Sequence, residues 1–209
     1  MPPSEPVDDS DDLVPRFDRV ERWAHGALAV LMLTCLATAV ALYVPDVSAR
    51  IGQRPLVSTV HVVAGFLLPV PLLVALVSRS YRADLTRLNR FSPADWDWLR
   101  SSDRRAGRIR VGKFNAGQKL NAAFTAGAVA VMLLTGSVMR LGAAPDDWRS
   151  GATFVHDWLA LAVAVVALGH MWMAARDPAA MLGMRTGSVP RWWARAEHAA
   201  WLDKHDARD

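Results

Sequence analysis

Residues 152–175 read ATFVHDWLALAVAVVALGHMWMAA, an apolar stretch that contains two histidines, His156 and His170. A helix needs roughly 20 apolar residues to cross a bilayer, so this stretch is long enough to span one. Three other stretches have the same apolar character, at about 24–44, 56–77 and 122–141. The sequence therefore predicts an all-α integral membrane protein, folded as a bundle of four transmembrane helices.

The composition of the 209-residue chain agrees with four spans joined by polar segments. Hydrophobic residues make up 52% of the chain and charged residues 21%, and the charged residues gather outside the apolar stretches. This division excludes a soluble globular domain and a disordered chain. The single cysteine, Cys35, excludes an internal disulfide framework and a cysteine-rich metal centre. Pro69 and Pro71 interrupt the second span, where they predict a kink.

The distribution of Lys and Arg predicts which parts of the chain face the cytoplasm. The N-terminal segment carries three, the segment between the second and third spans eleven and the C-terminal segment six, whereas the other two loops carry three in total. Because Lys and Arg are retained on the cytoplasmic side, we expect a multi-pass protein of the cell (plasma or inner) membrane with both termini cytoplasmic. The basic middle segment lacks interleaved aromatic residues over most of its length, so membrane lipid and no nucleic acid is expected around it.

Composition also divides the chain into three parts. Residues 1–15 are expected to be a disordered cytoplasmic tail. Residues 16–185 hold the four spans, and residues 186–209 form a cytoplasmic tail whose tryptophans, at helical spacing, predict a helix lying on the inner membrane surface. The two histidines of this tail, His198 and His205, are expected to be solvated. No internal repeat is evident.

Four of the six histidines lie inside the predicted spans, where an ionisable side chain is costly and implies a function. His25 and His170 lie near the cytoplasmic ends of the first and fourth spans. His61 and His156 lie near the outer ends of the second and fourth spans. The four side chains therefore form two pairs at two depths, and the two members of each pair come from different helices.

Two haems explain this arrangement. His156 and His170 are 14 residues apart, which places them roughly 21 Å apart along the helix axis and within roughly 40° of the same face. Each can therefore meet a histidine of another helix at its own depth. A haem iron binds neutral imidazole nitrogens, and its apolar ring suits the interior of a bundle. The sequence predicts two haems with bis-histidine iron ligation, which together form an electron path across the membrane.

Three other interpretations of the histidines are weaker. A proton relay needs closely spaced acids, and the spans offer Asp157 alone, at the outer edge. A zinc site needs its ligands at one level, whereas these histidines lie at two. Four unrelated packed histidines are not expected to share both depth and face.

These residues belong to motifs that resemble a known family. The sequence is similar to the cytochrome b (gamma) subunit of membrane-bound respiratory formate dehydrogenase over about residues 17–185. The resemblance rests on RFDRVERWAH at residues 16–25, on His61 with Gly65, and on the paired histidines of the fourth span. Its most specific element is VGKFNAGQKLN at residues 111–121, in which Phe114 replaces the tyrosine usual in the family.

The resemblance implies a set of cofactors and partners. His25 and His170 would ligate the cytoplasmic-side haem, and His61 and His156 the outer-side haem. Electrons would pass from an iron–sulfur (beta) subunit through both haems to a quinone, with menaquinone expected, on the cytoplasmic side. A molybdenum or tungsten catalytic (alpha) subunit would oxidise formate. This chain would therefore transfer electrons and reduce quinone without performing the formate chemistry itself.

The element NAGQK, residues 115–119, opens the third span at the level of the inner haem. Asn115 can donate a hydrogen bond to a quinone carbonyl, and Gly117 lets a ring or a water approach the backbone. With the resemblance, these features predict the quinone site. The alternative is a turn that simply opens the span, with Gln118 and Lys119 holding the loop or a haem propionate.

Other functions also fit the sequence. The chain also fits the cytochrome b subunit of a membrane [NiFe] hydrogenase or of another molybdenum oxidoreductase, although the NAGQK element favours formate dehydrogenase. A free-standing di-haem cytochrome b is a third candidate. A haem-free transporter or structural membrane protein is the candidate of a different class, and it would show no Soret absorption.

Overall fold

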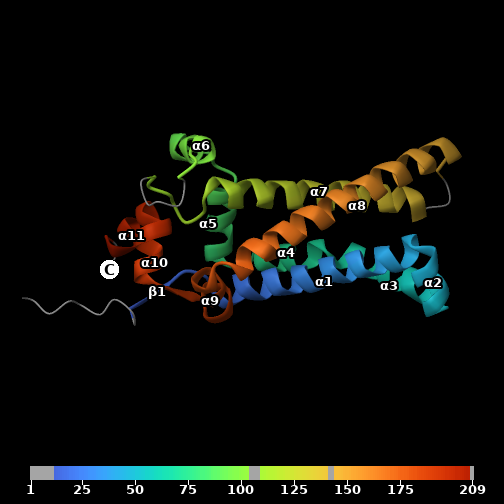
Figure 1. Ribbon diagram of the computed structural model, residues 1–209, viewed down its shortest axis with the longest axis horizontal. Helices are drawn as coiled ribbons and strands as arrows, with labels where there is room; N and C mark the ends of the chain where they lie inside the picture. The colour runs from blue at the N-terminus through green and yellow to red at the C-terminus, as the bar shows by residue number, and fades with distance from the viewer. Residues whose placement is uncertain (1–11, 104–108, 141–143, 208–209) are drawn as a thin grey trace, which may run out of the picture.

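The computed structural model describes residues 12–103, 109–140 and 144–207. Long apolar helical segments run side by side along its length (Figure 1). They are α1 (Arg19–Tyr43), α3 (Arg54–Leu67) continued by α4 (Pro69–Ala75), α7 (Ala116–Arg140) and α8 (Asp146–Ala175). These four segments are long and apolar enough to cross a membrane, and they overlap the four predicted spans. The predicted all-α membrane bundle is confirmed.

The outer faces of these helices are apolar. They carry many large exposed hydrophobic side chains, including Val30, Leu134, Val165 and Leu168. An exposed apolar surface of this extent is unfavourable in water but favourable in contact with lipid tails. A helix is also suited to lipid because its backbone N–H and C=O groups bond within the helix. The bundle therefore matches a lipid environment.

The second span is broken where its prolines predict a kink. Helix α3 ends at Leu67 and α4 begins at Pro69, with Leu68 between them. The N–H of Leu68 donates to the carbonyl of Gly65 at 3.2 Å, in a tighter turn than that of an α-helix. Because proline has no N–H, Pro69 and Pro71 cannot continue the regular hydrogen-bond ladder, and the helix is interrupted at Leu68 before it restarts at Pro69.

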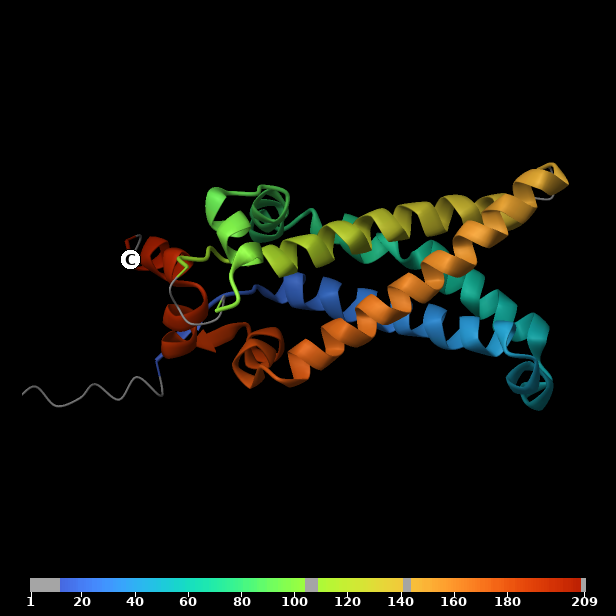
Figure 2. The same cartoon turned by 45° about the horizontal axis from the view of Figure 1, so that its top comes forward.

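The four spans form two antiparallel hairpins. Helix α1 packs against α3 and α4, and α7 packs against α8, which also contacts α1. A short helix, α2 (Pro45–Ile51), joins α1 to α3 and ends at Gly52, whose φ of 64° lies in the left-handed region that glycine adopts without strain. We call this end of the bundle the far end. Figure 2 shows that the other short elements gather at the opposite end, which we call the cap end.

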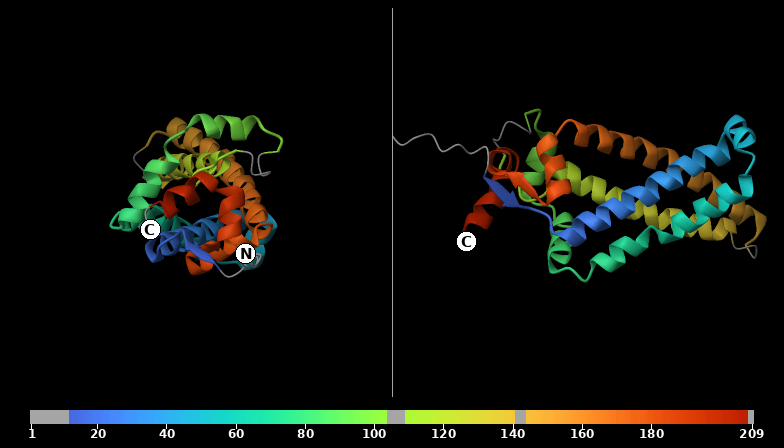
Figure 3. Two further views of the ribbon diagram at one scale, coloured as in Figure 1. Left: turned by 90° about the vertical axis from the view of Figure 1, so that its left-hand side faces the viewer. Right: turned by 90° about the horizontal axis from the view of Figure 1, so that it is seen from below.

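The cap end is built from both ends of the described chain. Strand β1 (Leu13–Pro15) pairs antiparallel with β2 (Ser188–Pro190), with Val14 opposite Val189. The right-hand view in Figure 3 places β1 at the same end as the last helix. The other cap elements are α5 (Arg79–Leu88), α6 (Pro93–Arg100), α9 (Pro178–Thr186), α10 (Arg191–Glu197) and α11 (Ala199–Asp206).

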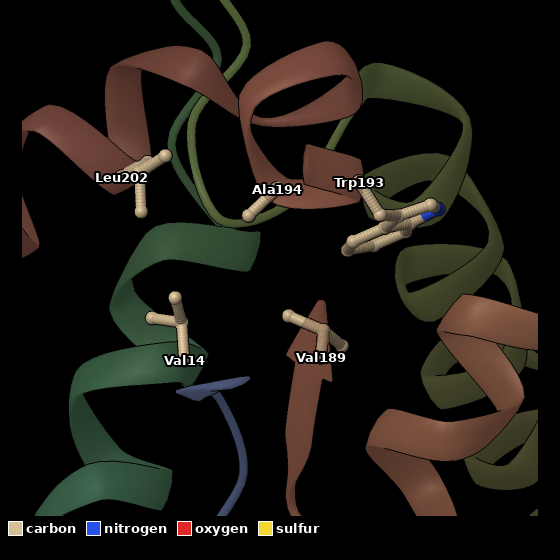
Figure 4. Close-up of a cluster of buried hydrophobic side chains, with 5 residues drawn as sticks. All are labelled: Val14, Val189, Trp193, Ala194 and Leu202. Atoms are coloured by element: carbon tan, nitrogen blue, oxygen red, sulfur yellow. The ribbon is translucent and has the colours of Figure 1, made fainter. Parts of the chain in front are cut away.

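This cap corrects the expectations for both tails. Residues 13–15, expected at the end of a disordered tail, are a strand, whereas residues 1–11 lie outside the described part of the chain. The single surface helix expected in the C-terminal tail is instead two helices, α10 and α11, separated at His198. Trp193 is 5% exposed and packs in a cluster with Val14, Val189, Ala194 and Leu202 (Figure 4). The apolar side chains of the two tails bury one another, so Trp193 packs on protein rather than on lipid.

The structure also reveals an internal repeat. Residues 16–21, RFDRVE, and residues 113–118, KFNAGQ, lie 97 residues apart and form the same cap at the starts of α1 and α7. Asp18 and Glu21 exchange side-chain-to-backbone bonds of 2.7 Å, and Asn115 and Gln118 exchange equivalent bonds of 2.9 and 3.0 Å. These are capping boxes, which satisfy free N–H groups at a helix start. The expectation of no repeat was wrong. Asn115 and Gln118 stand where the first hairpin has Asp18 and Glu21, so the residue types differ while the hydrogen bonds are the same.

Candidate functional site

The four histidines of the spans meet as two pairs, each formed by side chains of two different helices. At the cap end, the ring centres of His25 on α1 and His170 on α8 lie 6.1 Å apart. At the far end, the ring centres of His61 on α3 and His156 on α8 lie 6.3 Å apart. These are the same two pairs that depth along the spans predicts, and α8 supplies one histidine to each.

The separation of the rings fits a haem iron between two imidazoles. Two metal–imidazole bonds of about 2.0 Å, with about 1.1 Å from each bonding nitrogen to its ring centre, place the two centres about 6 Å apart. Both observed separations have this value. If the histidines were simply packed against each other, the two pairs would not need to share this one ring separation. The geometry therefore accommodates bis-histidine haem at each pair.

Two glycines shape the far-end pair. An ideal Cβ at Gly136 on α7 would lie 3.5 Å from Cε1 of His156, so α7 and the imidazole are in close contact there. Gly65 lies one turn after His61 on the same face of α3, and no atom lies within 4 Å of its Cβ position. Gly65 therefore leaves room for a flat ring beside His61, and Gly136 lets α7 pack directly against the imidazole of His156.

Both far-end imidazoles have a hydroxyl partner. Nδ1 of His61 lies 2.9 Å from Oγ1 of Thr38 on α1, and Nδ1 of His156 lies 2.9 Å from Oγ1 of Thr135 on α7. Each contact joins the two helices of one hairpin. Sequence reasoning missed both threonines, although each lies within a predicted span. The missing information was which face of each helix meets its neighbour.

The cap-end pair has a different surrounding. The side chains of His25 and His170 are exposed. Within residues 12–103, 109–140 and 144–207, neither ring nitrogen of either histidine makes a hydrogen bond to another residue. The two pairs therefore differ in their outer contacts although the spacing of their rings is nearly the same.

Asn115 stands immediately before α7, where its amide is held by the capping box. Its Oδ1 accepts from the N–H of Gln118 at 2.9 Å, and its own N–H donates to Oε1 of Gln118 at 3.0 Å. Its Nδ2 donates to no other residue in the described part of the chain, although the residue is 9% exposed. The turn that opens the span is thus present, and it leaves the amide donor unused.

Gly117 has a role that the sequence does not predict. An ideal Cβ there would lie 3.1 Å from Cη2 of Trp98 on α6, closer than side chains normally pack. Gly117 therefore allows the Trp98 ring to lie against the first turn of α7. The predicted place of Gly117 in the quinone site stays a prediction.

Two buried lysines bind the cap to the spans. Nζ of Lys119 donates to Asp95 at 2.7 Å and to the carbonyl of Arg90 at 2.9 Å. Nζ of Lys113 bonds the carboxylate of Asp84 and lies 3.8 Å from that of Glu21. Lys119 therefore holds the loop, one of the two alternatives predicted for it. These contacts attach α5 and α6 to the starts of α1 and α7.

A buried arginine occupies the centre of the cap. Arg16 is 6% exposed, donates to the carbonyl of Lys113 at 2.6 Å and lies over the ring of Trp193 at 4.7 Å. Burial lowers the pKa of Arg16 to about 10, opposed by the charges of Asp84 and Asp177. The guanidinium thus remains charged at neutral pH while it links the first span to the C-terminal helices.

Comparison with known proteins places this architecture in a family. The family model described as prokaryotic cytochrome b561 matches residues 16–187, a region that contains both hairpins and all four paired histidines. No curated protein matches the chain. The match extends over most of the sequence and agrees with the bundle of four membrane-spanning helices. The chain therefore belongs to the prokaryotic cytochrome b561 family, whose members are b-haem electron-transfer proteins of the membrane.

Proposed function

We propose that this chain carries electrons across the membrane through two b-type haems, one at each histidine pair, and delivers them to a quinone at the cap end. One observation carries the proposal: two imidazole pairs on a single bundle, each with ring centres about 6 Å apart, lie at two depths. Each pair supplies two axial ligands. Haem bound there would supply the one-electron redox chemistry that electron transfer needs.

Helix α8 sets the distance between the two sites. His156 and His170 are 14 residues apart on this uninterrupted helix, roughly 21 Å along its axis. The rigid helix keeps one ligand of each pair at a constant separation. The flanking hairpins supply His61 and His25, so both hairpins are needed to complete the two sites.

The cap end is assigned to the cytoplasm. It contains α5, α6 and the C-terminal helices, which carry most of the Lys and Arg outside the spans. The far-end loops carry three. The orientation rule for basic loops therefore favours an outer position for the far-end pair and a cytoplasmic position for the cap-end pair. The resemblance to the formate dehydrogenase subunit then supports electron entry at the far-end pair and exit at the cap-end pair.

The quinone site is proposed beside Asn115. Reduction of a quinone to a quinol takes two electrons and two protons, so the site needs access to a haem and to water. The Asn115 amide is oriented by its capping box, and its Nδ2 is available to a carbonyl oxygen. Asn115 opens α7 at the same end of the bundle as the His25–His170 pair. Protons would come from the cytoplasm.

The partner is proposed to be a formate dehydrogenase, with an iron–sulfur subunit docked at the far end and a molybdenum or tungsten subunit that oxidises formate. The support is the VGKFNAGQKLN element, which resembles that of the formate dehydrogenase subunit. Its residues form the cap of α7 and the contacts of Lys119. The matching family is named also for the cytochrome b of nickel hydrogenases, which makes a hydrogenase the second candidate.

Purification of the complex in mild detergent tests both levels of this proposal. We expect about two protohaems per chain and a low-spin, bis-imidazole spectrum. Mass spectrometry of the co-purified subunits then distinguishes a molybdenum or tungsten enzyme from a nickel one. A single haem would refute the two-site proposal, and a di-haem chain that purifies without any partner would favour a free-standing cytochrome.

A further inference from the structure

The internal repeat continues beyond the helix caps to the far-end histidines. Thr38 follows the N-cap residue Asp18 by 20 residues, and Thr135 follows Asn115 by the same number. Each threonine contacts the histidine of the second helix in its own hairpin at 2.9 Å. The far-end pair is thus the meeting point of two equivalent Thr–His units, one from each hairpin.

The direction of these hydrogen bonds follows from the other contacts of the hydroxyls. Oγ1 of Thr38 lies 2.7 Å from the carbonyl of Thr34, and Oγ1 of Thr135 lies 2.8 Å from the carbonyl of Val131. A hydroxyl has one proton, and in an apolar helix it is donated to the carbonyl four residues earlier. The hydroxyl oxygen then accepts from the imidazole, so Nδ1 carries the proton and Nε2 keeps its lone pair.

We propose that Thr38 and Thr135 are positioning residues for the far-end haem, holding both imidazoles as the Nδ1–H tautomer with Nε2 available to iron. We further propose that the two bonds make the far-end haem the lower-potential member of the pair. Both statements rest on the proposed function, because they require haem at both histidine pairs.

The effect on potential has a direct physical cause. A ligand histidine that donates its second N–H becomes a stronger electron donor through the coordinating nitrogen, which stabilises the oxidised metal. The bond is stronger in an apolar interior than in water. Within the described residues the cap-end histidines have no equivalent acceptor. The difference favours electron flow from the far end to the cap end.

The test uses isosteric substitutions in haem-loaded protein. Thr38→Val, Thr135→Val and the double variant remove the hydroxyl and keep the shape. Thr38→Ser and Thr135→Ser keep the hydroxyl. Thr34→Val is the matched control, because Thr34 lies one turn from Thr38 and donates to the carbonyl of Val30 without contacting an imidazole. Redox titration of the two visible bands and the electron paramagnetic resonance g-values are measured, and neither readout requires turnover.

We expect the midpoint potential of the far-end haem to rise in each valine variant and to rise further in the double variant. Its g-values should change as the imidazole planes lose their restraint. The potential of the cap-end haem should stay constant, and both serine variants should behave as the wild type. Loss of the far-end haem in a valine variant, with retention in the matching serine variant, would also support the inference.

Three results would overturn the inference. They are equal shifts of both haems, an unshifted far-end haem in the double variant, or the same shift in Thr34→Val. Loss of the haem in the serine variants with retention in the valine variants would assign the role to packing of the methyl group. A wild-type protein with one haem would refute the proposed function itself, whereas two haems with unshifted potentials would refute this inference alone.

Discussion

Nη2 of Arg16 lies 3.2 Å from Nε2 of His198, and this contact joins the entrance of the first span to the C-terminal helices. Nδ1 of His198 lies 2.7 Å from the carbonyl of Gly112, so Nδ1 donates there and Nε2 accepts from the guanidinium. His198 is 1% exposed and was expected to be solvated, so the structure corrects that expectation. One imidazole therefore joins three segments that are distant in the sequence.

Replacement of His198 tests this junction. In His198→Ala, the Gly112 carbonyl and the Arg16 guanidinium lose a partner in a buried site, which costs roughly 1–3 kcal/mol of stability. The melting temperature of the purified protein should fall, as measured by circular dichroism. Lys204→Ala, an exposed position on α11, is the control and should melt with the wild type. Equal melting of His198→Ala and the wild type would mean that the junction contributes nothing.

Each single histidine substitution should remove one haem, and the two substitutions within a pair should remove the same haem. His61→Ala and His156→Ala each take away one axial ligand of the far-end site, so both variants should lose the same haem. His25→Ala and His170→Ala should lose the other. The measurements are the haem-to-protein ratio and a redox titration of the remaining haem. If His156→Ala and His170→Ala lost the same haem, the assignment of α8 to two sites would fail.

Asn115 offers a way to separate capping from quinone binding. Asn115→Asp keeps an oxygen for the Gln118 N–H, as Asp18 does at the equivalent position of α1, but it removes the amide donor. We expect unchanged melting and intact haem spectra. Quinone should bind more weakly by roughly 1–3 kcal/mol, seen as a raised quinone concentration at half-maximal haem reoxidation.

The companion variant Asn115→Ala removes both functions of the side chain. It should lose quinone affinity to a similar degree and also lose about 1 kcal/mol of stability through the missing cap. Haem reduction by the upstream donor should persist in both variants. Unchanged quinone reduction in Asn115→Asp would place the quinone elsewhere.

The ion pair of Asp95 with Lys119 predicts a pH dependence of stability. Burial alone raises the pKa of Asp95, but hydrogen bonds from Lys119 and Ser92 outweigh burial, and the pKa lies below its ordinary value of 3.8. The lowered pKa means that the carboxylate stabilises the folded protein at neutral pH. This contribution is lost as the pH falls through the folded-state pKa.

Asp95→Asn should therefore lower the thermal stability at pH 7 by roughly 1–3 kcal/mol. The difference from the wild type should begin to shrink as the pH falls below about 4, near the unfolded-state pKa. It should close only below the lowered folded-state pKa, where the carboxyl of the folded wild type also becomes neutral. Asp97→Asn, an exposed neighbour on α6, is the matched control. A difference that stays constant down to pH 3 would show that charge does not carry the contribution.

Much of the transmembrane architecture is predictable because it depends on local properties. The length of an apolar stretch decides whether it can cross a bilayer, and Pro69 and Pro71 remove hydrogen bonds wherever they stand in a helix. The spacing of His156 and His170 on one helix sets their depths and common face. Those depths were sufficient to pair each with its partner, because only one other histidine lies at each level.

The cap and the contacts around the histidines required the tertiary structure. Hydropathy places Thr38 and Thr135 within spans, but the rotation of neighbouring helices decides that both hydroxyls meet an imidazole. Likewise, charge pattern alone marks Lys119 as a loop residue, and its burial against Asp95 depends on where α6 docks.

The sequence by itself therefore determined the number of spans, their kink and the levels of the four histidines, since each follows from the residues within one helix. Only the tertiary structure decided that residues 13–15 form a strand, that Trp193 faces protein and that His198 meets Arg16. These features depend on the pairing of segments nearly the full length of the chain apart. Burial of their apolar side chains against one another selects that pairing, and no local pattern encodes it.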